Sequence, residues 1–162
     1  MTKTPMPDDA ATANAMPVII HAQYIKDLSF ENPFAPDTLK PSATRPETDI
    51  GFSMDVRNIE FGDSDRTFEV TLGVSAKAVK DGRVIFLVEV QYALVVSLHN
   101  VAEDKMHPLL LMEMPRYAFP FVRQIIADLT QQAGYAPLLL SPVDFRSFYM
   151  QKFAQQEARA QA

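Results

Sequence analysis

Side chains that commonly carry out catalysis or bind metal ions are few in this chain. There is no cysteine, and the three histidines, His21, His99 and His107, are separated by 78 and 8 residues. A helical metal site uses two histidines four residues apart, and these spacings fit no hydrolase motif. The five glycines form no phosphate-binding loop. The sequence therefore predicts no enzyme, no metal site and no cofactor.

Asp27 and Glu31 are the best-placed pair of carboxyl groups. In a strand they lie on one face, about 13 Å apart at about 3.3 Å per residue. Alternation gives an apolar face with Tyr24, the stem of Lys26, Leu28 and Phe30, and a polar face with Asp27, Ser29 and Glu31. An exposed polar face supplies neither the burial nor the close like charge that tunes carboxyl groups for acid–base catalysis. From the residues alone, this is a solvated sheet face.

The composition is that of one globular domain. The 162 residues, of which 48% are hydrophobic and 22% charged, are enough to bury a sizeable core. A net charge of −5 without a cluster of Lys and Arg argues against nucleic acid as a partner. The lack of cysteine agrees with a reducing cytoplasm. We find no run of ~18 apolar residues and no signal-peptide pattern, so we expect no membrane insertion.

Alternation of apolar and polar residues predicts the strands. The expected strands are Val18–Glu31, Arg66–Lys80, Arg83–His99 and a weaker one within Lys105–Met114. Asp81-Gly82, between the second and third of these, is typical of a tight hairpin turn. Residues 32–65 contain four prolines and predict a long crossover segment, in which residues 50–56 alternate as an extended edge.

Two helices are expected after the strands. The first begins near Phe119, with Pro120 in its first turn, and ends at Gly134. The second has Ser141 as its N-cap and Asp144 three residues later. The expected fold class is therefore α+β: a four-stranded antiparallel sheet, two C-terminal helices packed on one side, and a long crossover segment after the first strand.

The two ends of the chain differ from the middle in composition. Residues 1–16 are rich in Ala, Thr, Pro and Asp and predict a disordered arm. Residues 156–162 are mostly Ala and Gln and predict a flexible tail. The domain is expected to span residues 17–155.

Three separated blocks of this sequence resemble the SecB family of protein-export chaperones. The blocks are residues 24–33 (YIKDLSFENP), residues 86–91 (FLVEVQ), and the pair 119–123 (FPFVR) and 140–145 (LSPVDF). They occur in the order and at about the separations of the family, and the resemblance runs from about residue 18 to 154. It implies a cytoplasmic homotetramer, a dimer of dimers, that holds unfolded precursor proteins and passes them to the SecA motor.

The resemblance also implies a docking surface for SecA. The matching positions are Asp27, Glu31, Leu87 and Glu89, and all four residue types are present. Carboxylates around one exposed leucine give a salt-sensitive contact that favours fast exchange. Such a contact suits the transfer of a client from one protein to another.

Eleven Phe, five Tyr and eight Met exceed what a small sheet and two helices need for a core. Flexible methionines and flat aromatic rings suit a surface that accepts many unfolded sequences. SecB proteins line their client groove with the crossover segment and the second helix. The matching residues here are Phe52, Met54 and Val56 from the crossover segment, and Tyr149, Met150 and Phe153 from the helix.

Two functions remain open at this point. The first is an ATP-independent holdase for precursors, since the chain has no nucleotide-binding motif. The alternative is a SecB-like chaperone or adaptor dedicated to another partner, such as an antitoxin. A dedicated chaperone has no need for Asp27, Glu31, Leu87 and Glu89 together.

Overall fold

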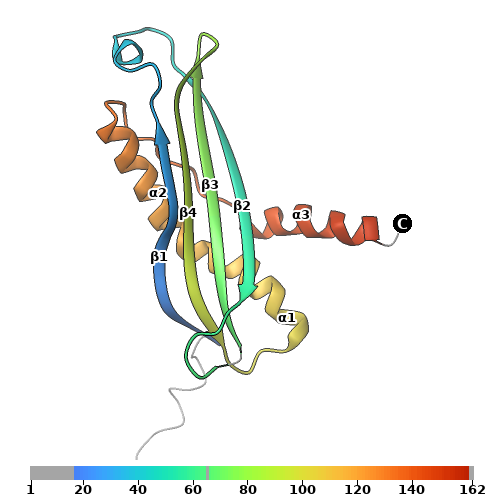
Figure 1. The fold of residues 1–162 in the computed structure, drawn as a ribbon. Coiled ribbons are helices and arrows are strands. Elements are labelled where there is room, and N and C mark those ends of the chain that lie inside the picture. Colours follow the sequence, from blue (N-terminus) through green and yellow to red (C-terminus); the bar gives the residue numbers. More distant parts are fainter. Residues whose placement is uncertain (1–16, 65, 161–162) are drawn as a thin grey trace, which may run out of the picture.

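The computed structural model describes residues 17–64 and 66–160. Figure 1 shows four long strands, β1 (Val18–Glu31), β2 (Glu47–Asn58), β3 (Thr67–Lys80) and β4 (Arg83–Leu98). They are followed by the helices α1 (Glu103–Pro108), α2 (Met114–Gln132) and α3 (Phe145–Ala160). Two short turns complete the chain, a 3-10 turn at Asp37–Leu39 and a π-helical turn at Leu109–Glu113. The expected arm, residues 1–16, lies outside the described residues.

The strands form one antiparallel sheet in the order β1-β4-β3-β2. The hairpin predicted at Asp81-Gly82 joins β3 to β4, and both residues have positive φ, 50° and 75°, as a tight primed turn requires. β1 and β2 are the two edges, so residues 32–46 must cross from one edge of the sheet to the other (Figure 1). The α+β class, the antiparallel sheet and the crossover segment are confirmed.

The fourth strand is not where the sequence predicted it. The segment within Lys105–Met114 is helical, and the fourth strand is β2, inside the predicted crossover segment. Pro108 and the apolar run at 109–112 suggested a short interrupted strand, but short apolar runs do not distinguish strand from helix. The strand β2 was obscured by the prolines that precede it.

The first long helix also begins earlier than predicted. α2 starts at Met114, with Pro115 in its first turn, and Pro120 lies inside it. A proline in the first turn removes no intrahelical hydrogen bond, so Pro115 fits the role that the sequence assigned to Pro120. The π-helical turn before α2 joins it to α1 without a loop.

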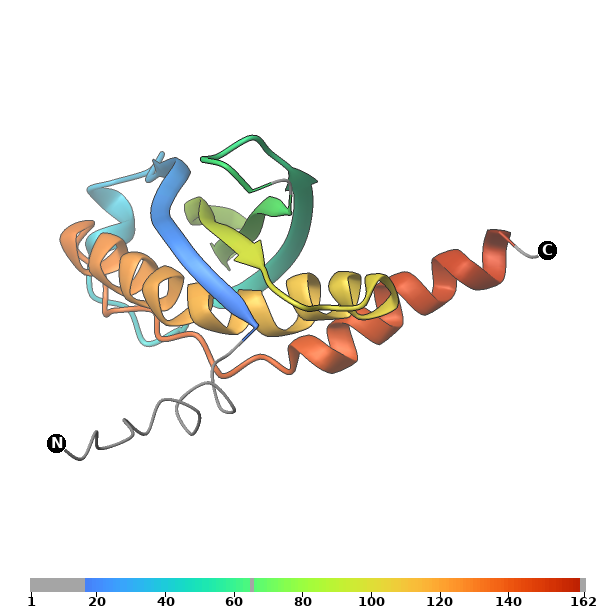
Figure 2. The same cartoon turned by 90° about the horizontal axis from the view of Figure 1, so that it is seen from below.

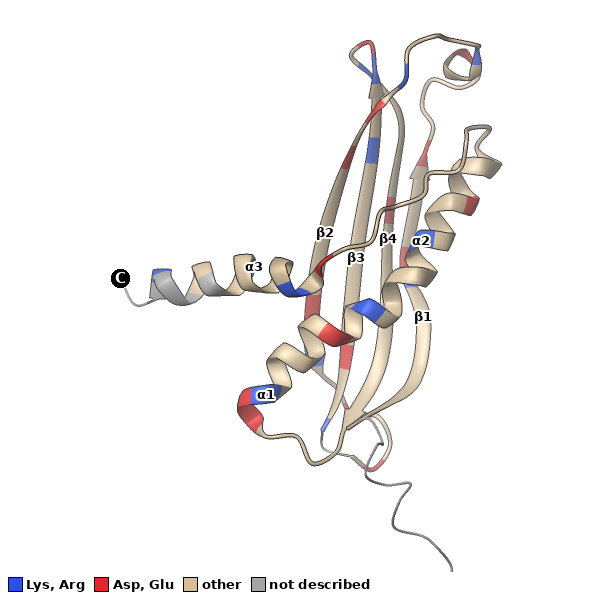
Figure 3. Cartoon of the chain, turned by 180° about the vertical axis from the view of Figure 1, so that it is seen from behind, with Lys and Arg blue, Asp and Glu red and all other residues tan. Residues whose placement is uncertain are grey.

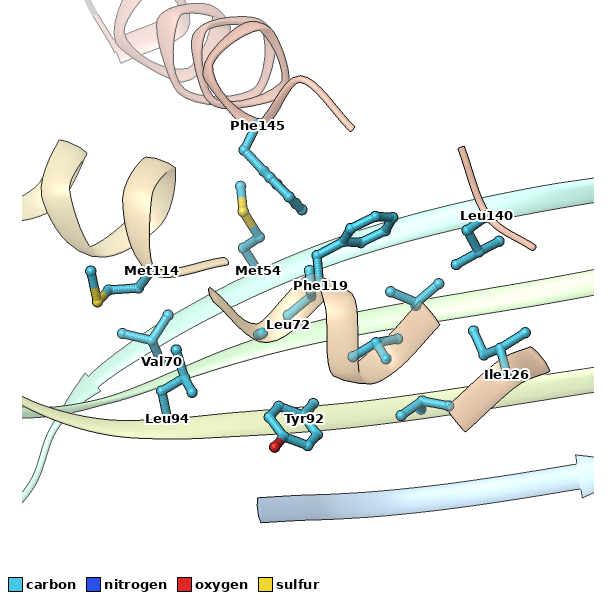
Figure 4. Packing of buried hydrophobic residues seen from close by; sticks show 14 of the residues in the cluster. Met54, Val70, Leu72, Tyr92, Leu94, Met114, Phe119, Ile126, Leu140 and Phe145 are labelled. Carbon is cyan, nitrogen blue, oxygen red and sulfur yellow. The ribbon is translucent and has the colours of Figure 1, made fainter. Parts of the chain in front are cut away.

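All helices lie on one side of the sheet. Seen from behind, α2 and the connection to α3 run across this face (Figure 3). Between them and the sheet lies the core, where Phe119 and Ile126 of α2 meet Leu72, Tyr92 and other sheet residues (Figure 4). Leu72, Val122 and Ile126 are fully buried. We call this side of the sheet the core face and the other side the outer face.

α3 begins over β2 and then leaves the sheet. Its N-cap is Asp144 instead of Ser141, because Asp144 Oδ1 accepts hydrogen bonds from the backbone N–H groups of Arg146 and Ser147, both at 3.1 Å. The helix continues to Ala160, beyond the predicted end of the domain at Gln155. Its C-terminal half extends past the edge of the sheet (Figure 2).

Candidate functional site

The pairing of β1 with β4 brings the four predicted SecA-docking residues onto the outer face. Asp27 lies opposite Gln91, Ser29 opposite Glu89, and Glu31 opposite Leu87. The three carboxylates are exposed and Leu87 is half-buried. We call Asp27, Glu31, Leu87 and Glu89 the acidic face. No helix of the described chain covers it (Figure 1).

A shallow cavity of about 290 Å³ opens on the outer face beside these carboxylates. Asp27, Glu89 and Gln91 line one part of it, and its lining from β2 and β3 includes Gly51, Ser53, Gly73 and Ser75. These small residues lie opposite one another, Gly51 with Ser75 and Ser53 with Gly73. The acidic face therefore borders a hollow rather than a flat surface.

Tyr24 lies on a different face from the one predicted. The pairing shifts between Ile25 and Asp27, which lie opposite the consecutive residues Tyr92 and Gln91, so Lys26 is an extra residue in a β-bulge. As a result Tyr24 shares the outer face with Asp27, whereas Leu28 and Phe30 are on the core face. The predicted alternation is therefore correct after the bulge, for Leu28 and Phe30, and wrong before it, for Tyr24.

Glu69 organises a polar cluster on the outer face that the sequence did not reveal. Its side chain is only 4% exposed and accepts hydrogen bonds from Lys26 Nζ at 2.5 Å, from Arg57 Nε at 2.8 Å and from the Tyr24 hydroxyl. Tyr24 and Lys26 belong to β1 and Arg57 to β2, so the two edges of the sheet meet at one carboxylate. We call these four residues the Glu69 cluster.

The contacts within this cluster change the acidity of its members. The hydrogen bond from Arg57, together with those from Lys26 and Tyr24, lowers the pKa of Glu69 to about 2 against the opposing effect of burial. Burial, and then the hydrogen bond to Glu69, raises the pKa of Tyr24 to about 12. Glu69 is thus a fixed anion at neutral pH. In the sequence it is one more polar residue in an alternating strand, and nothing marks it as buried.

The predicted client-binding residues of β2 lie on the core face near the start of α3. Phe52 and Val56 are half-buried, and the Phe52 ring meets Phe148 edge-on, with 6.4 Å between ring centroids. Met54 is only 6% exposed and belongs to the core. It offers little surface to a client, whereas its two neighbours on the same face do.

The predicted residues of α3 divide into two sets. Tyr149 and Phe153 are half-buried against His107 of α1: the Tyr149 hydroxyl lies 2.8 Å from His107 Nδ1, and the Phe153 ring is perpendicular to the imidazole at 5.0 Å between centroids. Met150 is 55% exposed and lies apart from these contacts. The six predicted residues therefore do not form one continuous patch.

Two apolar cavities flank the start of α3 along β2. One, of about 340 Å³, lies between the end of β2 and α1, and Val56, Phe68, Met106, His107 and Leu110 are among its lining residues. The other, of about 460 Å³, lies between the beginning of β2 and the connection to α3; its lining includes Ile50, Phe52, Leu138, Leu139, Leu140 and Val143. We call the two cavities and the residues named here the apolar groove.

The connection between α2 and α3 also lines this groove, which was not predicted from the sequence. Leu139 is 57% exposed, the most exposed of the large apolar side chains in the described chain. The signal was present in the sequence as three consecutive leucines after Pro137. An apolar run in a loop is unusual enough to mark a binding surface.

The described residues offer neither a metal cluster nor a membrane-spanning helix. In 17–64 and 66–160 no three His, Cys, Asp or Glu side chains gather as they would around a metal ion. Within the same ranges no helix has the length and hydropathy needed to span a membrane.

Comparison with known proteins identifies the family. The family model described as preprotein translocase subunit SecB matches residues 11–156. The protein-export protein SecB of Maricaulis maris is 44% identical over 161 residues, covering 99% of this chain and 91% of the relative. That of Caulobacter vibrioides is 40% identical over 162 residues, covering 98% and 97%.

A solved structure has the same fold. It is the Mycobacterium tuberculosis Rv1957 SecB-like chaperone in complex with a ChAD peptide from the Rv1956 HigA1 antitoxin, with a TM-score of 0.61 and 14% identity, covering 82% of this chain and 90% of that one. The matches in sequence cover nearly the whole of this chain, and this chain covers nearly the whole of the relatives. The chain therefore belongs to the SecB family of protein-export chaperones.

Proposed function

We propose that this protein binds unfolded precursor proteins and delivers them to the SecA motor without using ATP. The observation that carries the proposal is the acidic face, where the pairing of β1 and β4 places Asp27, Glu31, Leu87 and Glu89 on one open side of the sheet. Exposed carboxylates around a partly exposed leucine suit a partner with basic side chains and one apolar contact. The contact would form fast and weaken with salt.

Client binding is assigned to the apolar groove on the opposite side of the sheet. Phe52, Val56 and Leu139 line the groove, and Tyr149, Met150 and Phe153 of α3 remain proposed contacts beside it. Met54 supports the groove from within the core. Separation of the two surfaces by the sheet lets a client and SecA bind at the same time.

We also propose a homotetramer in the cytoplasm. On α2, Tyr117 and Phe121 are 40% and 47% exposed, and on the edge strand β1, Ile25 and Leu28 are 47% and 39% exposed. Large apolar side chains on an open helix and an open edge favour association between copies of the chain. Phe121 stacks on Tyr92, which lies opposite Ile25, so these side chains form one patch. An isologous contact made twice is the usual way in which a dimer of dimers closes.

The alternative, a chaperone dedicated to an antitoxin, draws on the solved SecB-like chaperone that binds an antitoxin peptide. That likeness is one of fold. The complete acidic face and the 40–44% identity to protein-export proteins favour the export function.

Calorimetric titration with SecA tests the proposal. Wild type is expected to bind, more weakly as salt rises, and Asp27→Asn and Glu89→Gln should each weaken binding about tenfold or more. Glu60→Gln is the matched control, because Glu60 is an exposed carboxylate in the loop between β2 and β3. Absence of SecA binding alongside binding of an unfolded chain would favour the dedicated chaperone.

A further inference from the structure

The pairing of β1 with β4 shifts at His21 and again at Lys26, and the Lys26 bulge sets the face of the residues that follow it, including Asp27. Regular alternation through a strand that contains Lys26 would put Tyr24, Lys26 and Leu28 on one face and Asp27 on the other. In the structure Tyr24 and Asp27 are both on the outer face, because Lys26 has no opposing residue on β4. A shift of one residue in the pairing of β1 would turn Asp27 toward the core.

The side chain of the extra residue is held by one buried group. Lys26 Nζ lies 2.5 Å from Glu69 Oε1, and Glu69 is 4% exposed. The same carboxylate binds Tyr24, two residues before the bulge, and Arg57 from the opposite edge of the sheet. The flanking β4 residue Ala93 lies opposite Tyr24 and is fully buried, so its small side chain leaves room for this contact across β4.

β1 needs such an anchor because few buried side chains hold residues 23–29 in place. It is an edge strand, and from Gln23 to Ser29 all its side chains are exposed. Phe30, which stacks on Phe86 with 5.8 Å between ring centroids, is the next residue with a substantial buried contact. Edge strands with few buried side chains are prone to shifts in register.

We infer that Glu69 is a positioning residue for SecA binding: it anchors the Lys26 bulge and so holds Asp27 and Glu31 on the outer face. This inference rests on the proposed function, since the acidic face is the proposed SecA site. Glu69 itself is buried and takes no part in the contact. Its role is to present β1 in the one register that displays the carboxylates.

Four substitutions test the anchor. Glu69→Gln and Lys26→Met should each weaken SecA binding about tenfold and raise the rate of hydrogen exchange at the amides of residues 27–31. Lys26→Arg keeps the ion pair and should bind SecA like wild type. Arg57→Met removes a cation from the same carboxylate but from the unbulged strand β2, so its effect on SecA affinity should be below about threefold.

Deletion of Lys26 separates anchoring from general destabilisation. Ile25 already lies opposite Tyr92 and Asp27 opposite Gln91, so deleting Lys26 gives an unbroken pairing in which both keep their partners. Without a bulge there is nothing for Glu69 to anchor. Deletion of Lys26 in the Glu69→Gln background should therefore restore SecA affinity to within about threefold of wild type.

The inference and the proposed function fail in different ways. Unchanged exchange at residues 27–31 in both Glu69→Gln and Lys26→Met would overturn the inference, whether or not wild type binds SecA. Faster exchange with unchanged SecA affinity would also overturn it, as would failure of the Lys26 deletion to rescue Glu69→Gln. Failure of wild type to bind SecA would overturn the proposed function, and with it the positioning role.

Discussion

Glu31 lies directly opposite Leu87 in the antiparallel pairing of β1 with β4, on the side of the sheet that no helix of the described chain covers. The pair places a charge beside the one large apolar side chain of the acidic face. Leu87→Asp should abolish SecA binding, because it removes the apolar contact and adds a fourth carboxylate among three. Since Leu87 is half-buried on the outer face, the cost in stability should stay at about 1–2 kcal/mol.

The measurement is calorimetry with SecA, combined with thermal unfolding and binding of an unfolded client. Leu87→Met is the matched control, because it keeps an apolar side chain of similar volume. Client affinity should be unchanged in both variants, as the apolar groove lies behind the sheet. SecA binding retained by Leu87→Asp would show that the docking surface lies elsewhere.

Phe153→Asp should lower the affinity for an unfolded client about tenfold, or about 1.4 kcal/mol. Phe153 is half-buried beside His107, at the end of the apolar groove formed by α1 and β2. A carboxylate there would place a charge where an apolar segment of the client is expected to lie. Competition between the protein and the spontaneous refolding of a client measures the effect.

Gln155→Asp provides the control for this substitution. Gln155 is exposed on the same helix, so the variant adds the same charge without removing an aromatic ring. Thermal unfolding should be nearly unchanged in the control and lowered only slightly in Phe153→Asp. Equal loss of client affinity in the two variants would point to net charge instead of the groove.

Thr130→Val should destabilise the protein by about 1–3 kcal/mol. The Thr130 hydroxyl is fully buried, donates to the carbonyl of Ile126 at 2.8 Å and accepts from the backbone N–H of Leu138 at 2.9 Å. Valine has the same shape but leaves that N–H without its partner. Because Leu138 belongs to the apolar groove, hydrogen exchange at this amide should also accelerate.

The same substitution at Thr71 gives a matched comparison. Thr71 is 8% exposed on β3, and its buried hydroxyl has no hydrogen-bond partner among the described residues. Thr71→Val should therefore be neutral or stabilising in urea unfolding. A loss at Thr71 as large as that at Thr130 would contradict the hydrogen-bond argument.

The sequence predicted the strands whose alternation was undisturbed, and it failed where local signals conflicted. Residues 67–80 alternate without interruption and form β3, and Asp81-Gly82 forms the hairpin. By contrast, Pro108 and Pro115 punctuate one continuous helical run, so the helix start was placed too late. The cause is that a proline early in a helix looks the same in the sequence as a proline that ends one.

The acidic face was predictable because its residues lie on strands with a clear resemblance to the family. The Glu69 cluster was not, because it joins β1, β3 and β2 through side chains far apart in the sequence. The bulge at Lys26 was not predictable either. A single extra residue leaves the local pattern intact, and only the pairing with β4 reveals it.

Glu69 should make the stability of the protein depend on acid. Its pKa is about 2 in the folded protein and 4.5 ordinarily, so folding favours the ionised form. The contribution of Glu69 to the stability of the folded protein is therefore complete above pH 4.5 and is lost as the pH falls from there toward 2.

Glu69→Gln should lower the free energy of unfolding at pH 7 by about 2 kcal/mol, and the difference from wild type should shrink as the pH falls to 3. Urea unfolding at fixed protein concentration measures it, with Glu60→Gln, expected to stay within about 0.5 kcal/mol of wild type, as the exposed control. A difference between Glu69→Gln and wild type that stays constant between pH 7 and 3 would show that the ionised carboxylate is not what the cluster depends on.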